Sequence, residues 1–286
     1  MGRRRTTFSR VELVLVDHPE PHVAVVTLNR PERLNALSID LAVALDETLA
    51  AVASENDTWV VVLTGAGRAF CSGLDLKDYG LLPGIEGLTV GRIAQRSMRA
   101  YSRIVLTMRR MPQPVVAAVN GPAYGGGMCL SLAADLRIAA RSAIFNATGI
   151  VNGLTSTEMA AGWLLPRLVG ASRANDLLLT GREVDAAEAE RMGLVSRVVD
   201  EGEALPEALV AARGMCRFSP YGLAMTKSAL WANLEITSLE TAIELEDRNQ
   251  LMLGFTENLQ EAIRAFDAGR TPVYTDEPRR DLFDRP

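Results

Sequence analysis

The strongest constraint on the fold is the alternation of short apolar segments with helical patterns between residues 11 and 200. The apolar segments have the length and the β-branched content of strands, and they cover 11–17, 22–29, 59–64, 115–119 and 136–140. Helical spacing of apolar residues marks 38–54 and 90–111, and the glycines at 125–127 begin another short helix. Strands that alternate with helices predict an α/β fold with a covered sheet.

The pattern changes near residue 205. From there the sequence predicts helices without intervening strands, over 203–216, 221–234, 239–253 and 257–266. We therefore predict two parts, a core over 1–204 and a helical region over 205–286.

The composition argues against several functional classes. Thirty basic residues against thirty-five acidic ones give a net charge of −5, which is not typical of a nucleic-acid-binding protein. The two histidines, His18 and His22, both belong to a predicted hairpin near the N-terminus, and the three cysteines are scattered, so a histidine-based triad or a zinc site is not expected. No apolar run reaches the length of a bilayer span, so we expect a soluble cytoplasmic protein.

Two glycine-rich segments follow predicted strands and offer main-chain donors. They are Arg68–Lys77 (RAFCSGLDLK) and Asn120–Cys129 (NGPAYGGGMC). Glycine lets the backbone approach a ligand closely, and a helix that begins within Gly125–Gly127 presents free N–H groups to negative charge. Two such N–H groups that converge on one oxygen would form an oxyanion hole.

Four motifs, in order and in spacing, resemble the enoyl-CoA hydratase/isomerase (crotonase) family: 29–37 (NRPERLNAL), 69–77 (AFCSGLDLK), 119–129 (VNGPAYGGGMC) and 178–199 (LLTGREVDAAEAERMGLVSRVV). The resemblance extends over about residues 11 to 275. It implies a spiral of ββα units with a helical C-terminal trimerisation region, whose trimers often pair into hexamers. It also implies acyl-CoA thioester substrates from fatty-acid metabolism and no metal or redox cofactor.

The resemblance also implies roles for particular residues. The amides of Leu74 and Gly126 would stabilise a thioester enolate. The positions at which the family contacts CoA are Arg33, Ala36, Ser72, Asp75, Leu76 and Lys77. A cation at Lys77 suits a phosphate, although an ordinary solvated lysine is the alternative.

The C-terminal stretch 265–272 (AFDAGRTP) resembles the family's closing motif. Its phenylalanine and basic residue, here Phe266 and Arg270, would reach the CoA of a neighbouring subunit. Gly269 stands where the family has a lysine, so one charge contact is expected to be missing.

The sequence departs from the family's hydratases at both catalytic glutamates, because Cys129 and Gly149 occupy those positions. Hydration of a conjugated double bond needs a base for the water and an acid for the α-carbon. Glu158 is the first candidate for proton transfer, ahead of Asp78 and Tyr79. The resemblance and this departure together lead us to expect a nominal enoyl-CoA hydratase, an isomerase that uses a single acid/base, or a non-catalytic acyl-CoA-binding protein.

Glu158, Cys129 and Gly149 each have a second interpretation. Thr155 and Glu158 form a T-x-x-E pattern, which predicts a capping box at a helix start. Cys129 is either a buried structural cysteine or a thiol whose pKa is lowered at a helix N-terminus. Gly149 would leave room for a bulky or branched acyl group.

Overall fold

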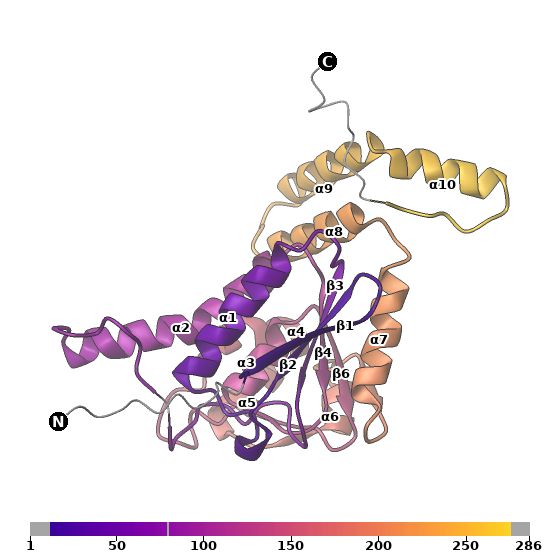
Figure 1. The fold of residues 1–286 in the computed structure, drawn as a ribbon. Coiled ribbons are helices and arrows are strands. Elements are labelled where there is room, and N and C mark those ends of the chain that lie inside the picture. Colours follow the sequence, from indigo (N-terminus) through magenta and orange to yellow (C-terminus); the bar gives the residue numbers. More distant parts are fainter. Residues whose placement is uncertain (1–11, 79, 276–286) are drawn as a thin grey trace, which may run out of the picture.

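A six-stranded sheet forms the centre of the structure, a computed structural model that describes residues 12–78 and 80–275 (Figure 1). From one edge to the other its strands are β1 (Val14–Glu20), β2 (Val23–Leu28), β3 (Val60–Gly65), β4 (Val115–Val119), β6 (Leu136–Ala140) and β9 (Arg197–Val199). Strand β1 is antiparallel to β2, and the other neighbours are parallel. The predicted α/β class is confirmed.

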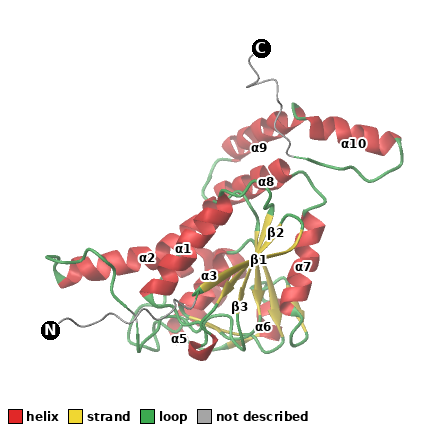
Figure 2. Ribbon diagram, in the orientation of Figure 1, coloured by secondary structure: helices red, strands yellow, loops and turns green. Residues whose placement is uncertain are grey.

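Successive residues of a strand point to opposite faces of the sheet, and in β2, β3 and β4 both faces are buried. Val26 and Leu63 face the larger core, which is covered by α1 (Ile39–Ala53), α2 (Val90–Arg110) and α3 (Gly126–Ala133). Val25 and Val62 face the smaller core on the other side, where α7 (Ala204–Met215) packs (Figure 2). This two-sided burial explains why β2, β3 and β4 are almost entirely apolar, whereas the edge strand β1 is mostly exposed and carries polar residues.

A second, smaller sheet contains β5 (Ala123–Tyr124), β7 (Ile144–Asn146) and β8 (Val184–Asp185). The chain repeatedly runs from the main sheet to this sheet and then into a helix. It does so through β4, β5 and α3, and again through β6, β7 and α4 (Ala161–Val169). These are the ββα units that the resemblance implies. The remaining core helices are α5 (Ala171–Thr180), α6 (Ala186–Arg191) and a 3-10 helix over Pro31–Arg33.

A buried arginine holds the end of α3 in place. The guanidinium of Arg137, on β6, donates to the carbonyls of Ser131 at 3.2 Å, Ala134 at 2.6 Å and Leu194 at 2.8 Å. Burial lowers the pKa of Arg137 to about 10, so the group stays charged at neutral pH. A cation at a helix C-terminus is favoured by the carbonyl groups that lack helical partners there.

The C-terminal helices extend away from the core (Figure 1). They are α8 (Pro220–Asn233), α9 (Leu239–Gly254) and α10 (Glu257–Asp267). Lys227 anchors α8, because its buried ammonium donates to the carbonyls of Met108 and Gln113 at 2.7 and 2.8 Å. Helix α9 buries none of its side chains within this chain. Helix α7, the first helix of the predicted C-terminal region, packs on the sheet of the core. The division between residues 204 and 205 stays a prediction.

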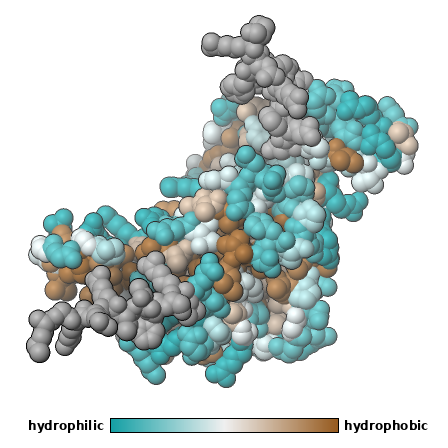
Figure 3. All heavy atoms as spheres, in the orientation of Figure 1, coloured by the Kyte–Doolittle hydropathy of each residue, from teal (hydrophilic) through white to brown (hydrophobic). Residues whose placement is uncertain are grey.

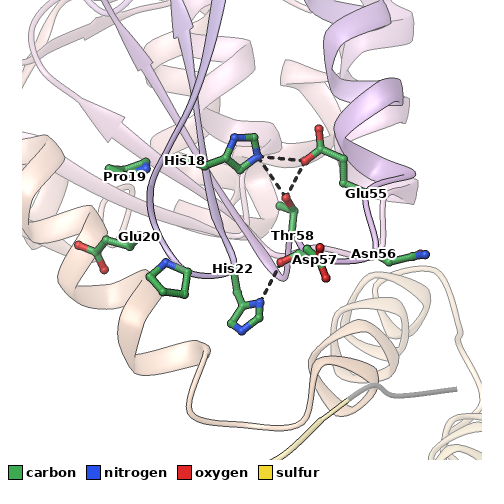
Figure 4. A pocket seen from close by; sticks show the side chains of 9 residues that line it. His18, Pro19, Glu20, His22, Glu55, Asn56, Asp57 and Thr58 are labelled. Atoms are coloured by element: carbon green, nitrogen blue, oxygen red, sulfur yellow. Dashed lines mark hydrogen bonds and ion pairs between the residues drawn. The ribbon is translucent and has the colours of Figure 1, made fainter.

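His18 and His22 line the same polar hollow at the β1–β2 hairpin (Figure 4). His18 Nε2 lies 3.1 Å from a Glu55 carboxylate oxygen, and the His22 ring stacks on Trp59 at 3.8 Å between centroids. None of the residues that line this hollow lines the cavity described below. In the described ranges, no group of acidic, histidine and cysteine side chains is arranged to hold a metal ion.

Within residues 12–78 and 80–275, no helix has the length and apolar character needed to cross a membrane.

Candidate active site

The two glycine-rich loops meet beyond the carboxyl ends of β3 and β4, which are parallel neighbours in the sheet. Gly73 makes this contact: its φ is +84°, and a Cβ on it would lie 2.7 Å from the carbonyl oxygen of Tyr124. A Cβ at Gly73 would also lie 3.4 Å from the nitrogen of Gly126. The close approach therefore requires glycine, and it brings Leu74 beside Gly126.

The pairing around Leu74 and the helix start at Gly126 leave both N–H groups available to a ligand. Leu37 bonds to the residues on either side of Leu74, through Gly73 O and Asp75 N, so the N–H of Leu74 points away from this pairing. Gly126 is the first residue of α3, where N–H groups lack a helical partner. Both residues line one cavity. The role predicted for the two amides fits this geometry and stays a prediction.

The cavity in front of these amides has a volume of about 930 Å³ and is mostly apolar. Its walls come from the loop after Leu74, from α2 and from the segment before α4. Glu158 is the one carboxylate among the described residues that line it. Of the two lower-ranked candidates, Asp78 is exposed and does not line it, and Tyr79 lies outside the described residues.

Glu158 is brought into the cavity by a strained turn. Met159 and Ala160, which follow it, have φ angles of +43° and +66°, a region that residues other than glycine rarely adopt. The carboxylate lies beside the glycine run, because a Cβ on Gly125 would be 3.3 Å from Glu158 Oε1. Burial raises the pKa of Glu158 above its ordinary value. Strain of this kind and a raised carboxyl pKa are both typical of catalytic sites.

The capping box predicted for Thr155 and Glu158 is wrong. Helix α4 begins at Ala161, its N-cap is Ala160, and no side chain caps it. The left-handed turn at Met159 and Ala160 separates Glu158 from the helix. The Glu158 carboxylate is therefore free to face the cavity.

Cys129 is the buried structural cysteine of the two alternatives. Its thiol donates to the main-chain oxygen of Glu158, with sulfur and oxygen 3.5 Å apart. Burial, and then the charge of Glu158, raise the pKa of the Cys129 thiol well above its usual value. The alternative, a thiol pKa lowered at the helix N-terminus, is wrong, because desolvation outweighs any effect of the helix N-terminus. Cys129 instead helps to hold the segment that carries Glu158.

The expectation of extra room at Gly149 is also wrong. A Cβ on Gly149 would lie 2.0 Å from the carbonyl oxygen of Thr155 and 3.1 Å from the Cα of Ser156. The backbone of 155–156 therefore packs directly on this glycine. Gly149 does not line the cavity, and it adds no space for an acyl group.

The predicted CoA contacts gather around Asp75, at the edge of the site. The Asp75 carboxylate accepts from Arg33 at 2.7 Å, pairs with Arg30 at 3.1 Å, and accepts from the N–H groups of Lys77 and Asp78. Burial alone would raise the pKa of Asp75, but the hydrogen bonds from Arg33 and the main chain hold it below its ordinary value. This carboxylate thus stabilises the loop after Leu74, and its oxygens are already occupied.

The other predicted CoA residues differ in accessibility. Ala36 is buried, and the Ser72 hydroxyl donates to the Arg33 carbonyl at 3.5 Å. The side chains of Leu76 and Lys77 are exposed beside the site, where a ligand can reach them. Their roles, including the two alternatives for Lys77, stay predictions.

Phe266 and Arg270 belong to the C-terminal region and do not line the cavity of their own chain. Phe266 is 86% exposed near the end of α10, and Arg270 pairs with Glu261 at 2.6 Å. Any contact with CoA would involve another subunit, as the resemblance implies, and it stays a prediction.

The sequence analysis missed Tyr101 and the rest of the α2 wall. The Tyr101 hydroxyl lies 3.5 Å from the carbonyl oxygen of Leu37, beside the Leu37–Leu74 pairing. Burial, together with the charge of Asp75, raises the pKa of Tyr101 to about 12, so the phenol stays neutral and donates. Helical spacing revealed α2 itself but not which of its faces lines a ligand cavity.

Residues 19–277 match the model of the enoyl-CoA hydratase/isomerase family. The chain belongs to this family. A probable enoyl-CoA hydratase of Mycobacterium tuberculosis is 50% identical over 270 residues, which cover 94% of this chain and 95% of the relative. As a member of the enoyl-CoA hydratase/isomerase family, the protein belongs among enzymes that process acyl-CoA thioesters.

Two solved structures of the family are also similar. One is a probable enoyl-CoA hydratase/isomerase from Mycobacterium abscessus, with a TM-score of 0.88, 46% identity, and coverage of 93% of this chain and 100% of that one. The other is described as a monofunctional enoyl-CoA isomerase from Mycobacterium smegmatis, with a TM-score of 0.70, 45% identity, and coverage of 81% and 98%. The predicted crotonase fold is confirmed.

Proposed function

We propose that this protein is an enoyl-CoA isomerase that moves a double bond along the acyl chain of a CoA thioester. The observation that carries the proposal is the single carboxylate, Glu158, among the described residues of a cavity that also contains the amides of Leu74 and Gly126. The similarity to a monofunctional isomerase supports the same assignment.

The reaction begins with removal of a proton from the α-carbon of a 3-enoyl thioester by the ionised Glu158. The C–H electron pair forms a bond between the α-carbon and the carbonyl carbon, and negative charge develops on the thioester oxygen. The N–H groups of Leu74 and Gly126 stabilise this charge. One such donor is worth roughly 10²–10³ in rate.

The second step returns the same proton to the γ-carbon. Electrons flow back from the enolate oxygen, the carbonyl re-forms, and the double bond now lies between the α- and β-carbons. Glu158 ends the cycle ionised, as it began. No electrons are exchanged with a second substrate, so the reaction needs no redox cofactor.

Hydration, the nominal activity, fits the site less well. A base must deprotonate the water while an acid protonates the α-carbon, and each such group contributes roughly 10²–10⁴ in rate. The two positions at which the family's hydratases carry glutamates hold a buried thiol, Cys129, and the tightly packed Gly149.

Ultraviolet absorbance of the conjugated thioester distinguishes the two reactions, because isomerisation of a 3-enoyl-CoA raises it and hydration of a 2-enoyl-CoA lowers it. We expect isomerisation at about 1–10³ s⁻¹ and hydration slower by roughly 10²-fold or more. Faster hydration than isomerisation would contradict the proposal. Acyl-CoA binding without either reaction would favour the non-catalytic binding protein.

We also propose that the protein is a trimer or a hexamer. The C-terminal helices carry exposed apolar residues that this chain leaves uncovered, among them Leu239, Leu251, Phe255 and Phe266. Large exposed apolar surfaces favour association. Light scattering should give three or six times the chain mass of 30.9 kDa, and a monomer at micromolar concentration would contradict this assembly.

A further inference from the structure

One face of α2 forms an apolar stripe along the cavity. Its residues recur at helical spacing and all line the cavity: Val90, Ile93, Ala94, Ser97, Met98 and Tyr101. Tyr101, at the inner end, is 6% exposed, and Val90, at the outer end, is 83% exposed. The stripe therefore runs from the reaction centre outward, and Figure 3 shows apolar surface along the projecting end of this helix.

The polar groups of the stripe are already satisfied within the chain. The Ser97 hydroxyl donates to the carbonyl of Ile93 at 3.1 Å, and the Tyr101 hydroxyl contacts the carbonyl oxygen of Leu37. Two loops outside α2 present the exposed side chains of Leu81 and Leu154 to the same cavity. A ligand in this groove meets apolar surface on several sides and few free polar groups.

We infer that this groove binds a long acyl chain, so that the preferred substrates are medium- to long-chain enoyl-CoA thioesters. The inference rests on the proposed function for the identity of the ligand. Its occupant is the acyl chain because the stripe is continuous with the cavity that contains Leu74, Gly126 and Glu158.

The length of the stripe sets the length of the chain. From Val90 to Tyr101 the helix rises about 16 Å, at about 1.5 Å per residue. An extended alkyl chain advances about 1.25 Å per carbon, given C–C bonds of about 1.5 Å and near-tetrahedral angles. The stripe therefore matches roughly ten to thirteen carbons.

Calorimetric binding of saturated acyl-CoAs, which cannot be isomerised, tests the inference separately from catalysis. We expect affinity to rise about two- to fourfold per methylene group from hexanoyl-CoA to dodecanoyl-CoA, and to level off beyond. Replacement of Ala94, in the middle of the stripe, by tryptophan (Ala94→Trp) should weaken dodecanoyl-CoA binding by about tenfold or more and leave hexanoyl-CoA binding within about twofold. The matched control is Gln95→Trp, on the exposed side of α2, which should change neither.

Equal affinity for all chain lengths, or an equal loss for both ligands in Ala94→Trp, would overturn the inference. A change in oligomer mass in Ala94→Trp would also overturn it, because a second copy of the chain would then cover the stripe. Length-dependent binding without any isomerisation would retain the inference and reject the isomerase. Absence of binding at every length would reject both.

Discussion

Replacement of Glu158 by glutamine should lower the rate of isomerisation by roughly 10²–10⁴-fold, because an amide cannot accept the α-proton. Acyl-CoA binding should change little, since the amides of Leu74 and Gly126 and the apolar walls remain. Rates with a 3-enoyl-CoA and calorimetric binding measure the two effects. Glu207→Gln, at an exposed ion pair on α7, is a matched control. Full activity in Glu158→Gln would assign the proton transfer to another group.

The pH dependence of activity in the natural protein provides an independent check. Glu158 must be ionised to act as a base, so the rate of isomerisation should rise with pH, and the raised pKa of Glu158 places this rise above the range of an exposed glutamate.

The stability of Glu158→Gln should also depend on pH. The folded chain binds the Glu158 proton more tightly than the unfolded chain, so ionisation opposes folding as the pH rises. Glu158→Gln should therefore be more stable than the natural protein at neutral pH, with the difference lost below the ordinary glutamate pKa. Thermal unfolding at several pH values measures this.

Replacement of Arg137 by methionine should destabilise the fold by about 3–4 kcal/mol, because it leaves several buried carbonyls without a donor. For a chain of this size the melting temperature should fall by roughly 6–12 °C. Differential scanning calorimetry measures the change. The C-terminus of α3 should also exchange its amide hydrogens faster, since Ser131 and Ala134 lose their partner.

Arg141→Met is the matched control for Arg137→Met. Arg141 follows β6 closely, but it is exposed and pairs with Asp200 on the surface. Exposed ion pairs contribute little to stability, so this variant should unfold close to the natural protein. Similar melting temperatures for the two variants would contradict a structural role for Arg137.

The fold was largely predictable because it depends on periodic patterns. The apolar strands and the helices gave clear periodicities, and Ser38, the N-cap of α1, accepts a hydrogen bond from Leu41 N. The two glycine loops were also predictable as a meeting point, since parallel strands bring the loops after them to one edge.

The details of the site were less predictable, because they depend on close tertiary contacts. The T-x-x-E pattern at Thr155 has the composition of a capping box, but the left-handed turn at Met159 and Ala160 places the helix start elsewhere. A glycine in a sequence also does not reveal what lies against it. Gly149 suggested open space, whereas the Thr155 backbone fills it.

The contact between Gly149 and the Thr155 carbonyl also limits how this chain can evolve. Glycine and glutamate codons differ by as little as one base, so mutation supplies a carboxylate at position 149 readily. A Cβ 2.0 Å from a main-chain oxygen cannot be accommodated unless the backbone of 155–156 moves, and Glu158 lies on that same segment. A single substitution of Gly149 by glutamate would therefore displace the carboxylate of Glu158. Descendants of this chain can acquire hydratase chemistry at this position only through several coordinated changes.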